Sequence, residues 1–122
     1  AVADFNADGK PDVGVLNHYS DTVGILLGNG SGGFTAAGTF ATGGTRPLTL
    51  AVGDFNRDGH VDLGTANLSS HTVGVLFGNG SGGLGAAAVF PTGGTELIAV
   101  AAGDLNGDGY LDMAATSRVQ RT

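Results

Sequence analysis

The sequence predicts an all-β repeat protein built from four-stranded antiparallel units, and three observations support this prediction. The nine-residue pattern Asp-x-Asn-x-Asp-Gly-x-x-Asp begins at Asp4, Asp54 and Asp104, so it recurs every 50 residues. Residues 4–53 and 54–103 align without a gap and are identical at 28 positions. Short β-type runs alternate with Gly-rich turns, and no stretch has convincing helical periodicity. Repetition at this period is typical of propellers, solenoids and arrays.

The middle repeat shows the expected elements in order. Apolar residues alternate with small or polar ones over residues 48–53, which predicts a first strand that leads into the nine-residue loop. A second strand is expected over 62–67, where small residues allow close packing, and a third over 72–77, where apolar side chains share one face. The Gly-rich residues 78–83 predict a hairpin connection. A weaker, Ala-rich fourth strand over 84–90 suits an outer edge of the sheet.

Four antiparallel strands in about 50 residues correspond to one β-propeller blade. We therefore expect a single repeat region over residues 1–122, with units at about 1–47 and 48–97 and a partial unit at 98–122. The 24 Gly residues recur with the repeat, so they mark turns rather than disorder. About two and a half blades cannot close a ring, so we expect a segment or protomer of a larger propeller or assembly. The chain starts at Ala1 without Met, which suggests a processed product or an excised piece.

The spacing within each loop suits calcium, which takes about six to eight oxygen ligands in flexible geometry. Side-chain oxygens at the first, third and fifth positions converge, and the Gly that follows allows a sharp turn with positive φ. A backbone carbonyl at the seventh position and an Asp at the ninth would complete the sphere. An EF-hand closes later, with Glu, and is flanked by helices, so these are EF-hand-like loops on strands. The predicted ligands are Asp4, Asn6, Asp8, Lys10, Asp12, Asp54, Asn56, Asp58, His60, Asp62, Asp104, Asn106, Asp108, Tyr110 and Asp112, of which Lys10, His60 and Tyr110 act through backbone carbonyls.

The charge distribution supports metal binding over the alternative that Asp, Asn and Gly simply form turns. Of the eleven acidic residues, only Asp21 and Glu96 lie outside the three loops. Carboxylates that converge in one loop repel each other unless a cation is present. Three Ca²⁺ ions per chain would cancel the formal net charge of −6, so the acidity indicates a demand for metal rather than a basic partner.

Composition excludes several other classes. The five Lys and Arg residues form no patch, which argues against nucleic acid. No apolar run approaches the roughly 18 residues that a membrane helix needs, so we expect no membrane insertion. The chain has no Cys and hence no disulfide. Because free calcium at millimolar concentration is an extracellular condition, the predicted location is extracellular or at the cell surface.

The chain resembles the FG-GAP/VCBS repeat family over essentially its whole length. The resemblance rests on Gly-Asp-Phe-Asn-Arg-Asp-Gly-His-Val-Asp-Leu at residues 53–63 and Thr-Val-Gly-Val-Leu-Phe-Gly-Asn-Gly at 72–80. It implies calcium-bearing propeller blades like those of integrin alpha heads, certain fungal lectins and many bacterial surface proteins. It also implies that the Asp and Asn residues of each loop bind Ca²⁺. The Gly-Ala-Pro element of the family name is not present, and residues 41–44 and 91–94 occupy that region.

No catalytic residues are predicted, and the chain is not expected to be an enzyme. His18, His60 and His71 lie in separate turns or loops, and no Ser stands in a strand-turn-helix context for a nucleophile. The nine loop Asp residues repeat identically, whereas a glycosidase needs two carboxylates in different environments. The Gly-rich turns lack the Lys and the helix of a phosphate-binding loop.

The leading functional hypothesis is a non-catalytic, calcium-stabilised extracellular binding or adhesion module whose ligand is a carbohydrate or a protein. One alternative is a structural module that self-assembles through open blade edges into a ring or a filament, between which the sequence does not choose. Another is a non-catalytic propeller part of a larger secreted enzyme. Expected partners are copies of the chain or further blades of a longer chain. The candidate ligand contacts are His18, Tyr19, Arg46, His71 and Glu96, and Asn29, Asn67 and Asn79 head glycosylation sequons.

Overall fold

The computed structural model describes residues 1–118 and contains ten β-strands in three antiparallel sheets, with no helix in this part of the chain. The strand order within each sheet follows the sequence, as it does in a propeller blade. The predicted all-β class is therefore confirmed. The first sheet consists of β1 (Val2–Ala3), β2 (Asp12–Asn17), β3 (Thr22–Gly28) and β4 (Phe34–Ala41), the second of β5 (Pro47–Gly53), β6 (Asp62–Asn67), β7 (Thr72–Leu76) and β8 (Ala88–Pro91), and the third of β9 (Leu97–Gly103) and β10 (Asp112–Ser117).

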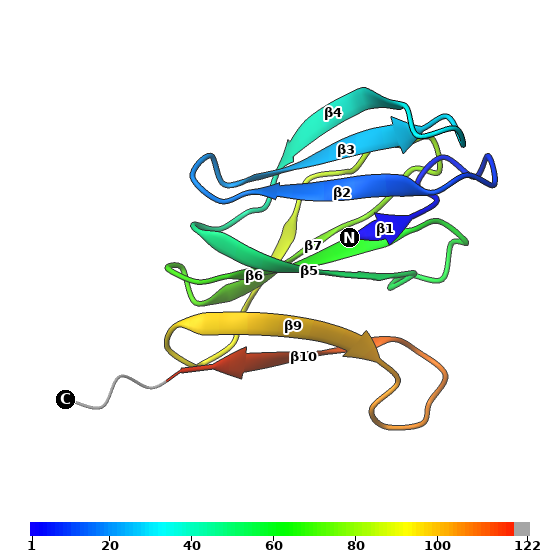
Figure 1. Ribbon diagram of the computed structural model, residues 1–122. Helices are drawn as coiled ribbons and strands as arrows, with labels where there is room; N and C mark the ends of the chain where they lie inside the picture. The colour runs from blue at the N-terminus through cyan, green and yellow to red at the C-terminus, as the bar shows by residue number, and fades with distance from the viewer. Residues whose placement is uncertain (119–122) are drawn as a thin grey trace.

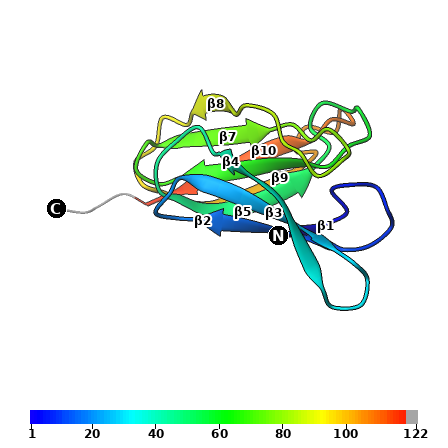
Figure 2. The same cartoon turned by 90° about the horizontal axis from the view of Figure 1, so that it is seen from above.

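The three sheets lie one above another, with β1–β4 at the top of Figure 1 and β9–β10 at the bottom. Seen from above, the strands of successive sheets overlap, so the sheets are stacked face to face rather than joined edge to edge (Figure 2). The stack does not close into a ring. It holds two four-stranded blades and half of a third.

Apolar side chains fill the space between the blades, as the alternating pattern predicts. Between the first and second blades, Val23 and Ile25 of β3 are fully buried against a cluster that includes Leu63 and Leu76. Between the second blade and the half-blade, Val73 and Val75 take the equivalent places and keep 7% exposure each. Each sheet thus depends on the next for burial of its face.

The strands of the middle repeat follow the sequence pattern closely, except for the fourth. β6 spans the predicted residues, but β8 begins only at Ala88, four residues after the predicted start. Leu84 makes one isolated bridge to Gly78 and then packs, with Ala87, against the core between the first two blades.

The three Asp-rich loops join the first and second strands of each unit and lie at one end of the stack, at the right in Figure 1. The turns between the second and third strands lie at the opposite end. The repeat places one loop per sheet, so the loops form a row along one end of the molecule. None of residues 1–118 lies in a helix long and apolar enough to cross a membrane.

Candidate metal centre

In each loop the side chains at the first, third and fifth positions gather around one point. In the first loop, the Asp8 backbone N–H donates to Asp4 Oδ1 at 3.1 Å and to Asn6 Oδ1 at 3.2 Å. Because one N–H reaches both oxygens, the two oxygens lie side by side. Asn6 Nδ2 also donates to Asp8 Oδ2 at 3.2 Å, which brings in the third side chain.

The same arrangement occurs in the other two loops, although the residue at the fourth position differs. The Asp58 N–H lies 3.1 Å from Asp54 Oδ1 and 3.2 Å from Asn56 Oδ1. In the third loop the corresponding distances from the Asp108 N–H are 3.2 Å to Asp104 and 3.1 Å to Asn106. The loop geometry therefore comes from the nine-residue pattern and not from its variable positions.

The Gly at the sixth position is needed for its backbone conformation rather than for space. Gly9, Gly59 and Gly109 have φ of 82°, 85° and 83°, and a Cβ at each would meet no atom within 4 Å. A positive φ of this kind is costly for residues with a side chain. The turn lets Gly9 N–H donate to Asp4 Oδ2 at 2.8 Å and Lys10 N–H donate to Asp8 Oδ1 at 2.9 Å.

The Asp at the ninth position differs from this group in its burial and its hydrogen bonds. Asp12 and Asp62 are fully buried, whereas Asp8 and Asp58 are exposed. Asp12 Oδ2 accepts the Phe5 N–H and Oδ1 accepts the Gly28 N–H, both at 2.8 Å. Each oxygen of Asp12 still has a free lone pair, so Asp12 could also bind calcium. Its role as a calcium ligand stays a prediction.

Local hydrogen bonds and burial shift the carboxyl groups in opposite directions. The backbone N–H of His60 lowers the pKa of Asp58, and the backbone N–H of Gly109 lowers the pKa of Asp104. Burial raises the pKa of Asp62, despite the two N–H groups that favour its charged form. At Asp58 and Asp104 the local hydrogen bonds therefore favour the ionised form that a cation requires.

The donor set fits a hard cation, because it consists of carboxylate and amide oxygens with no sulfur. Within residues 1–118, no three His, Cys, Asp or Glu side chains come together as a metal-binding group. Each loop gathers two carboxylates and one Asn, so the remaining ligands would have to come from backbone carbonyls, the ninth Asp or water. Asn6 would also have to turn its oxygen, rather than Nδ2, toward Asp8.

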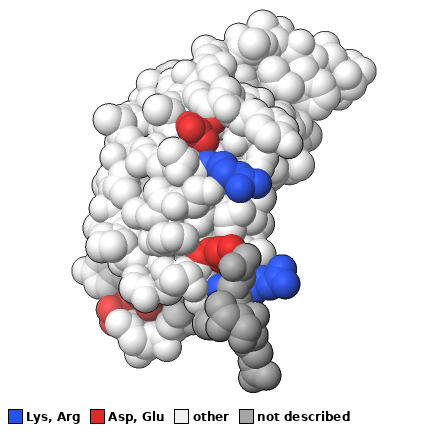
Figure 3. Space-filling view, turned by 90° about the vertical axis from the view of Figure 1, so that its left-hand side faces the viewer, with Lys and Arg blue, Asp and Glu red and all other residues white. Residues whose placement is uncertain are grey.

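The residues predicted to contact a carbohydrate or protein ligand lie at the end opposite the loops. Figure 3 shows this end, where charged patches are small and few. Most of them take part in contacts between neighbouring blades. His18 Nδ1 lies 3.0 Å from the Pro47 carbonyl oxygen, and His71 Nδ1 accepts the Glu96 N–H at 3.0 Å. Tyr19 is 95% exposed and meets His18 edge-on, with ring centroids 4.9 Å apart. His18 and His71 therefore each contact a backbone group of the following blade.

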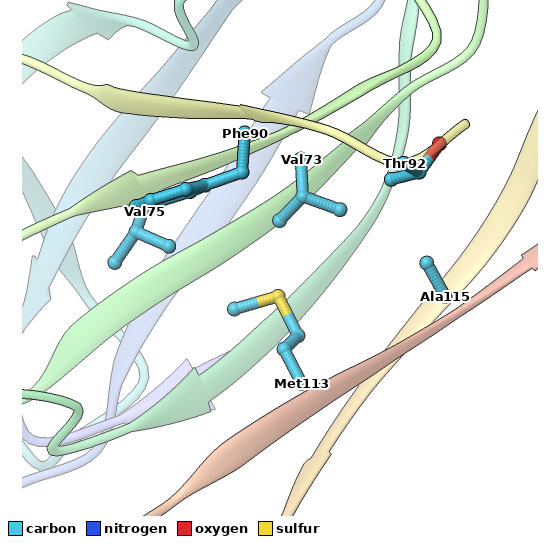
Figure 4. A pocket seen from close by; sticks show the side chains of 6 residues that line it. All are labelled: Val73, Val75, Phe90, Thr92, Met113 and Ala115. Atoms are coloured by element: carbon cyan, nitrogen blue, oxygen red, sulfur yellow. The ribbon is translucent and has the colours of Figure 1, made fainter. Parts of the chain in front are cut away.

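The boundary between the second blade and the half-blade carries a feature that the sequence did not indicate. A groove of about 380 Å³ opens between the second blade and the half-blade. Figure 4 shows Met113 pointing from β10 toward Val75 and Phe90 across this groove. Between the first two blades, Leu84 and Ala87 line a second groove of about 320 Å³ together with Phe40. The groove between the second blade and the half-blade is lined by Val73, Val75, Phe90, Thr92, Met113 and Ala115.

Stacked four-stranded sheets with an Asp-rich loop between the first and second strands define a β-propeller-like repeat module. Comparison with protein families matches the FG-GAP-like repeat to residues 4–65 and 64–115. These matches cover most of the chain, which therefore belongs to the FG-GAP-like repeat family. Comparisons with curated proteins and with solved structures found no match. The family is generally a non-catalytic binding or structural module.

Proposed function

We propose that the chain is a calcium-stabilised propeller module that acts by binding in an extracellular setting and has no catalytic activity. The observation that carries this proposal is the convergence of Asp4, Asn6 and Asp8, repeated with the same geometry in two further loops. All three loops lie at one end and present oxygen donors to solvent. Three ions would neutralise a chain of formal charge −6.

Calcium suits these loops better than magnesium. Magnesium requires near-octahedral geometry and gives up its water reluctantly, whereas calcium accepts a larger and less regular oxygen set. The proposed ligands in each loop are the three converging side chains, the ninth Asp and the seventh carbonyl, from Lys10, His60 or Tyr110. The Lys10 side chain lies beside its loop, with Nζ 3.8 Å from Asp8 Oδ2.

Two observations favour an extracellular binding role. Repeats of this family are typical of extracellular proteins. Tyr19 presents a nearly fully exposed ring at the end opposite the loops, beside the half-buried His18. An exposed aromatic face next to polar groups suits a carbohydrate or a protein surface. Calcium in this role stabilises the scaffold and does not contact the ligand, because the loops lie at the other end.

Isothermal titration of the chelator-treated chain tests the metal proposal. We expect three calcium ions per chain and much weaker binding of magnesium. Asp58→Asn should remove one ion and leave two, because the three loops use separate ligands. Binding of no calcium, or retention of a transition metal after chelation, would contradict the proposal.

A second candidate function is assembly, and the groove of Figure 4 favours it. β10 pairs only with β9 among the described strands, and its sequence has no Lys or Pro to discourage addition of a strand. Copies of the chain or further blades would cover both the edge and the groove. Sedimentation velocity in calcium should then show concentration-dependent association. A single monomer species at all concentrations would rule this function out.

A further inference from the structure

In the two complete blades, the ninth Asp of the loop is buried in a setting unlike that of the other loop side chains. Asp12 and Asp62 have no exposed surface, and both oxygens of each accept backbone N–H groups at 2.8 Å. One donor, Phe5 or Phe55, lies at the start of the same loop. The other, Gly28 or Gly78, lies 16 residues further along the chain, at the last residue of β3 or two residues after β7.

The second donor is a Gly because the two segments approach too closely for a side chain. A Cβ on Gly28 would lie 2.1 Å from the Pro11 carbonyl oxygen, and a Cβ on Gly78 would lie 2.1 Å from that of Val61. Both obstacles are backbone atoms, which cannot rotate away. The residue before each Asp is thus pressed against the end of the third strand, and the carboxylate bonds across the same junction.

The first donor connects the junction to the core and to the next blade. The Phe5 ring is 3% exposed and packs in the cluster between the first two blades. The Phe5 carbonyl accepts the N–H of Gly82, in the hairpin turn of the second blade, at 3.0 Å. Asp12 therefore holds a residue that contacts both its own blade and the following one.

We propose that Asp12 and Asp62 are positioning residues that clamp each Asp-rich loop to the end of the third strand, and that this clamp stabilises the blade with or without metal. A buried carboxylate with two N–H donors is a strong, charge-assisted arrangement. Losing it would leave two backbone N–H groups without acceptors, which is costly because these groups are buried at Asp12 and partly buried at Asp62. Unlike the calcium proposal, this inference needs no bound ion.

The third loop supplies an internal control. Asp112 Oδ2 accepts the Leu105 N–H at 2.9 Å, but no second backbone donor reaches Asp112 within residues 1–118. Asp112 is also partly exposed. The clamp is therefore complete in two repeats and half-formed in the third, and the same substitution should have a smaller effect there.

Thermal melting in excess chelator tests the clamp with three matched variants, Asp62→Asn, Asp58→Asn and Asp112→Asn. Asn has nearly the same shape as Asp. Its Nδ2 is a hydrogen-bond donor, however, and would face a backbone N–H, which is also a donor. We expect Asp62→Asn to lower Tm by roughly 10 °C. Asp58→Asn, at an exposed site, should change it by no more than about 3 °C, and Asp112→Asn should fall between them. Equal effects of Asp62→Asn and Asp58→Asn would overturn the proposal.

Hydrogen exchange on the unaltered chain, again in chelator, decides the matter even if Asp62→Asn does not fold. The amides of Phe55 and Gly78 should be protected at least roughly tenfold more than the exposed loop amide of Gly59. Exchange of Phe55 and Gly78 as fast as Gly59 would show that the carboxylate holds nothing closed, and the clamp would be rejected.

Discussion

β6 and β10 occupy the same place in successive repeats, yet their surroundings differ. All six residues of β6 are buried, whereas four of the six residues of β10 are exposed. β6 has a strand on each edge and a sheet on each face, while β10 pairs only with β9 among the described strands. In this architecture, a strand's burial is thus set by the neighbouring strands and blades more than by its own sequence.

The largest test of this comparison is a pair of truncations at equivalent positions. Leu63 of β6 is fully buried between two blades, and Met113 of β10 borders the open groove. Leu63→Ala should reduce the free energy of unfolding by about 2–5 kcal/mol, the usual range for a buried Leu. Met113→Ala should cost about 1 kcal/mol or less, because water already reaches the site. Urea denaturation measures both, and equal losses would mean that the half-blade is as well packed as the complete one.

Local pattern predicted the elements and the loops well. The alternation over residues 48–53 and the small residues of 62–67 specify strands by their own chemistry, and both strands formed where expected. The Gly at the sixth loop position signals the positive φ that Gly59 adopts. Such features need no information from elsewhere in the chain.

Distant contacts could not be predicted in the same way. The Gly28 partner of Asp12 is 16 residues away, and nothing in the loop points to it. The sequence assigns Asp21 to no site, yet its Oδ1 accepts the Arg46 N–H at 2.7 Å across a blade boundary. In the same way, His71 accepts the Glu96 N–H. Leu84 and Ala87, which precede β8, pack against the cluster between the first two blades. In each case the deciding partner lies in another element.

Calcium removal should affect the loops of the two complete blades and the loop of the half-blade differently. An ion that binds only the folded chain stabilises it by roughly 2.7 kcal/mol at a hundredfold excess over its Kd. Chelation should therefore lower Tm. As free calcium is reduced, the third loop should lose its ion first, because Asp112 is held by one N–H instead of two. Amide chemical shifts of Gly59 and Gly109, followed by NMR against free calcium, report each loop. Release of both ions at the same calcium concentration would show that the ninth Asp does not affect affinity.

In chelator, the pKa values of Asp58 and Asp62 should be shifted in opposite directions from the usual carboxyl value. The pKa of Asp58 is lowered by the His60 N–H, so its stabilising contribution is present above the usual carboxyl range and is lost as pH falls through the lowered value. Burial raises the pKa of Asp62, so ionising this carboxyl group costs more in the folded than in the unfolded chain, and stability falls as pH rises toward the raised value. The two N–H donors of the clamp offset part of this cost. NMR titration of the side-chain carboxyl carbons should show Asp62 above the usual range and Asp58 below it. The reverse order would mean that the two N–H donors of Asp62 outweigh its burial.

The smallest expected effect separates the first loop from the other two. Lys10 Nζ lies 3.8 Å from Asp8 Oδ2 and is about half exposed, whereas His60 and Tyr110 stand at this position in the other loops. An exposed pair of this kind contributes only about 0–1 kcal/mol. A cation beside the loop also opposes the approach of Ca²⁺, so Lys10→Gln should tighten calcium binding at the first loop by at most a few-fold, while changing Tm in chelator very little. Calorimetry at low and high salt measures this, because screening should shrink the difference between the two proteins. A gain that persists unchanged at high salt would mean that Lys10 acts through the apolar stem of its side chain and not through its charge.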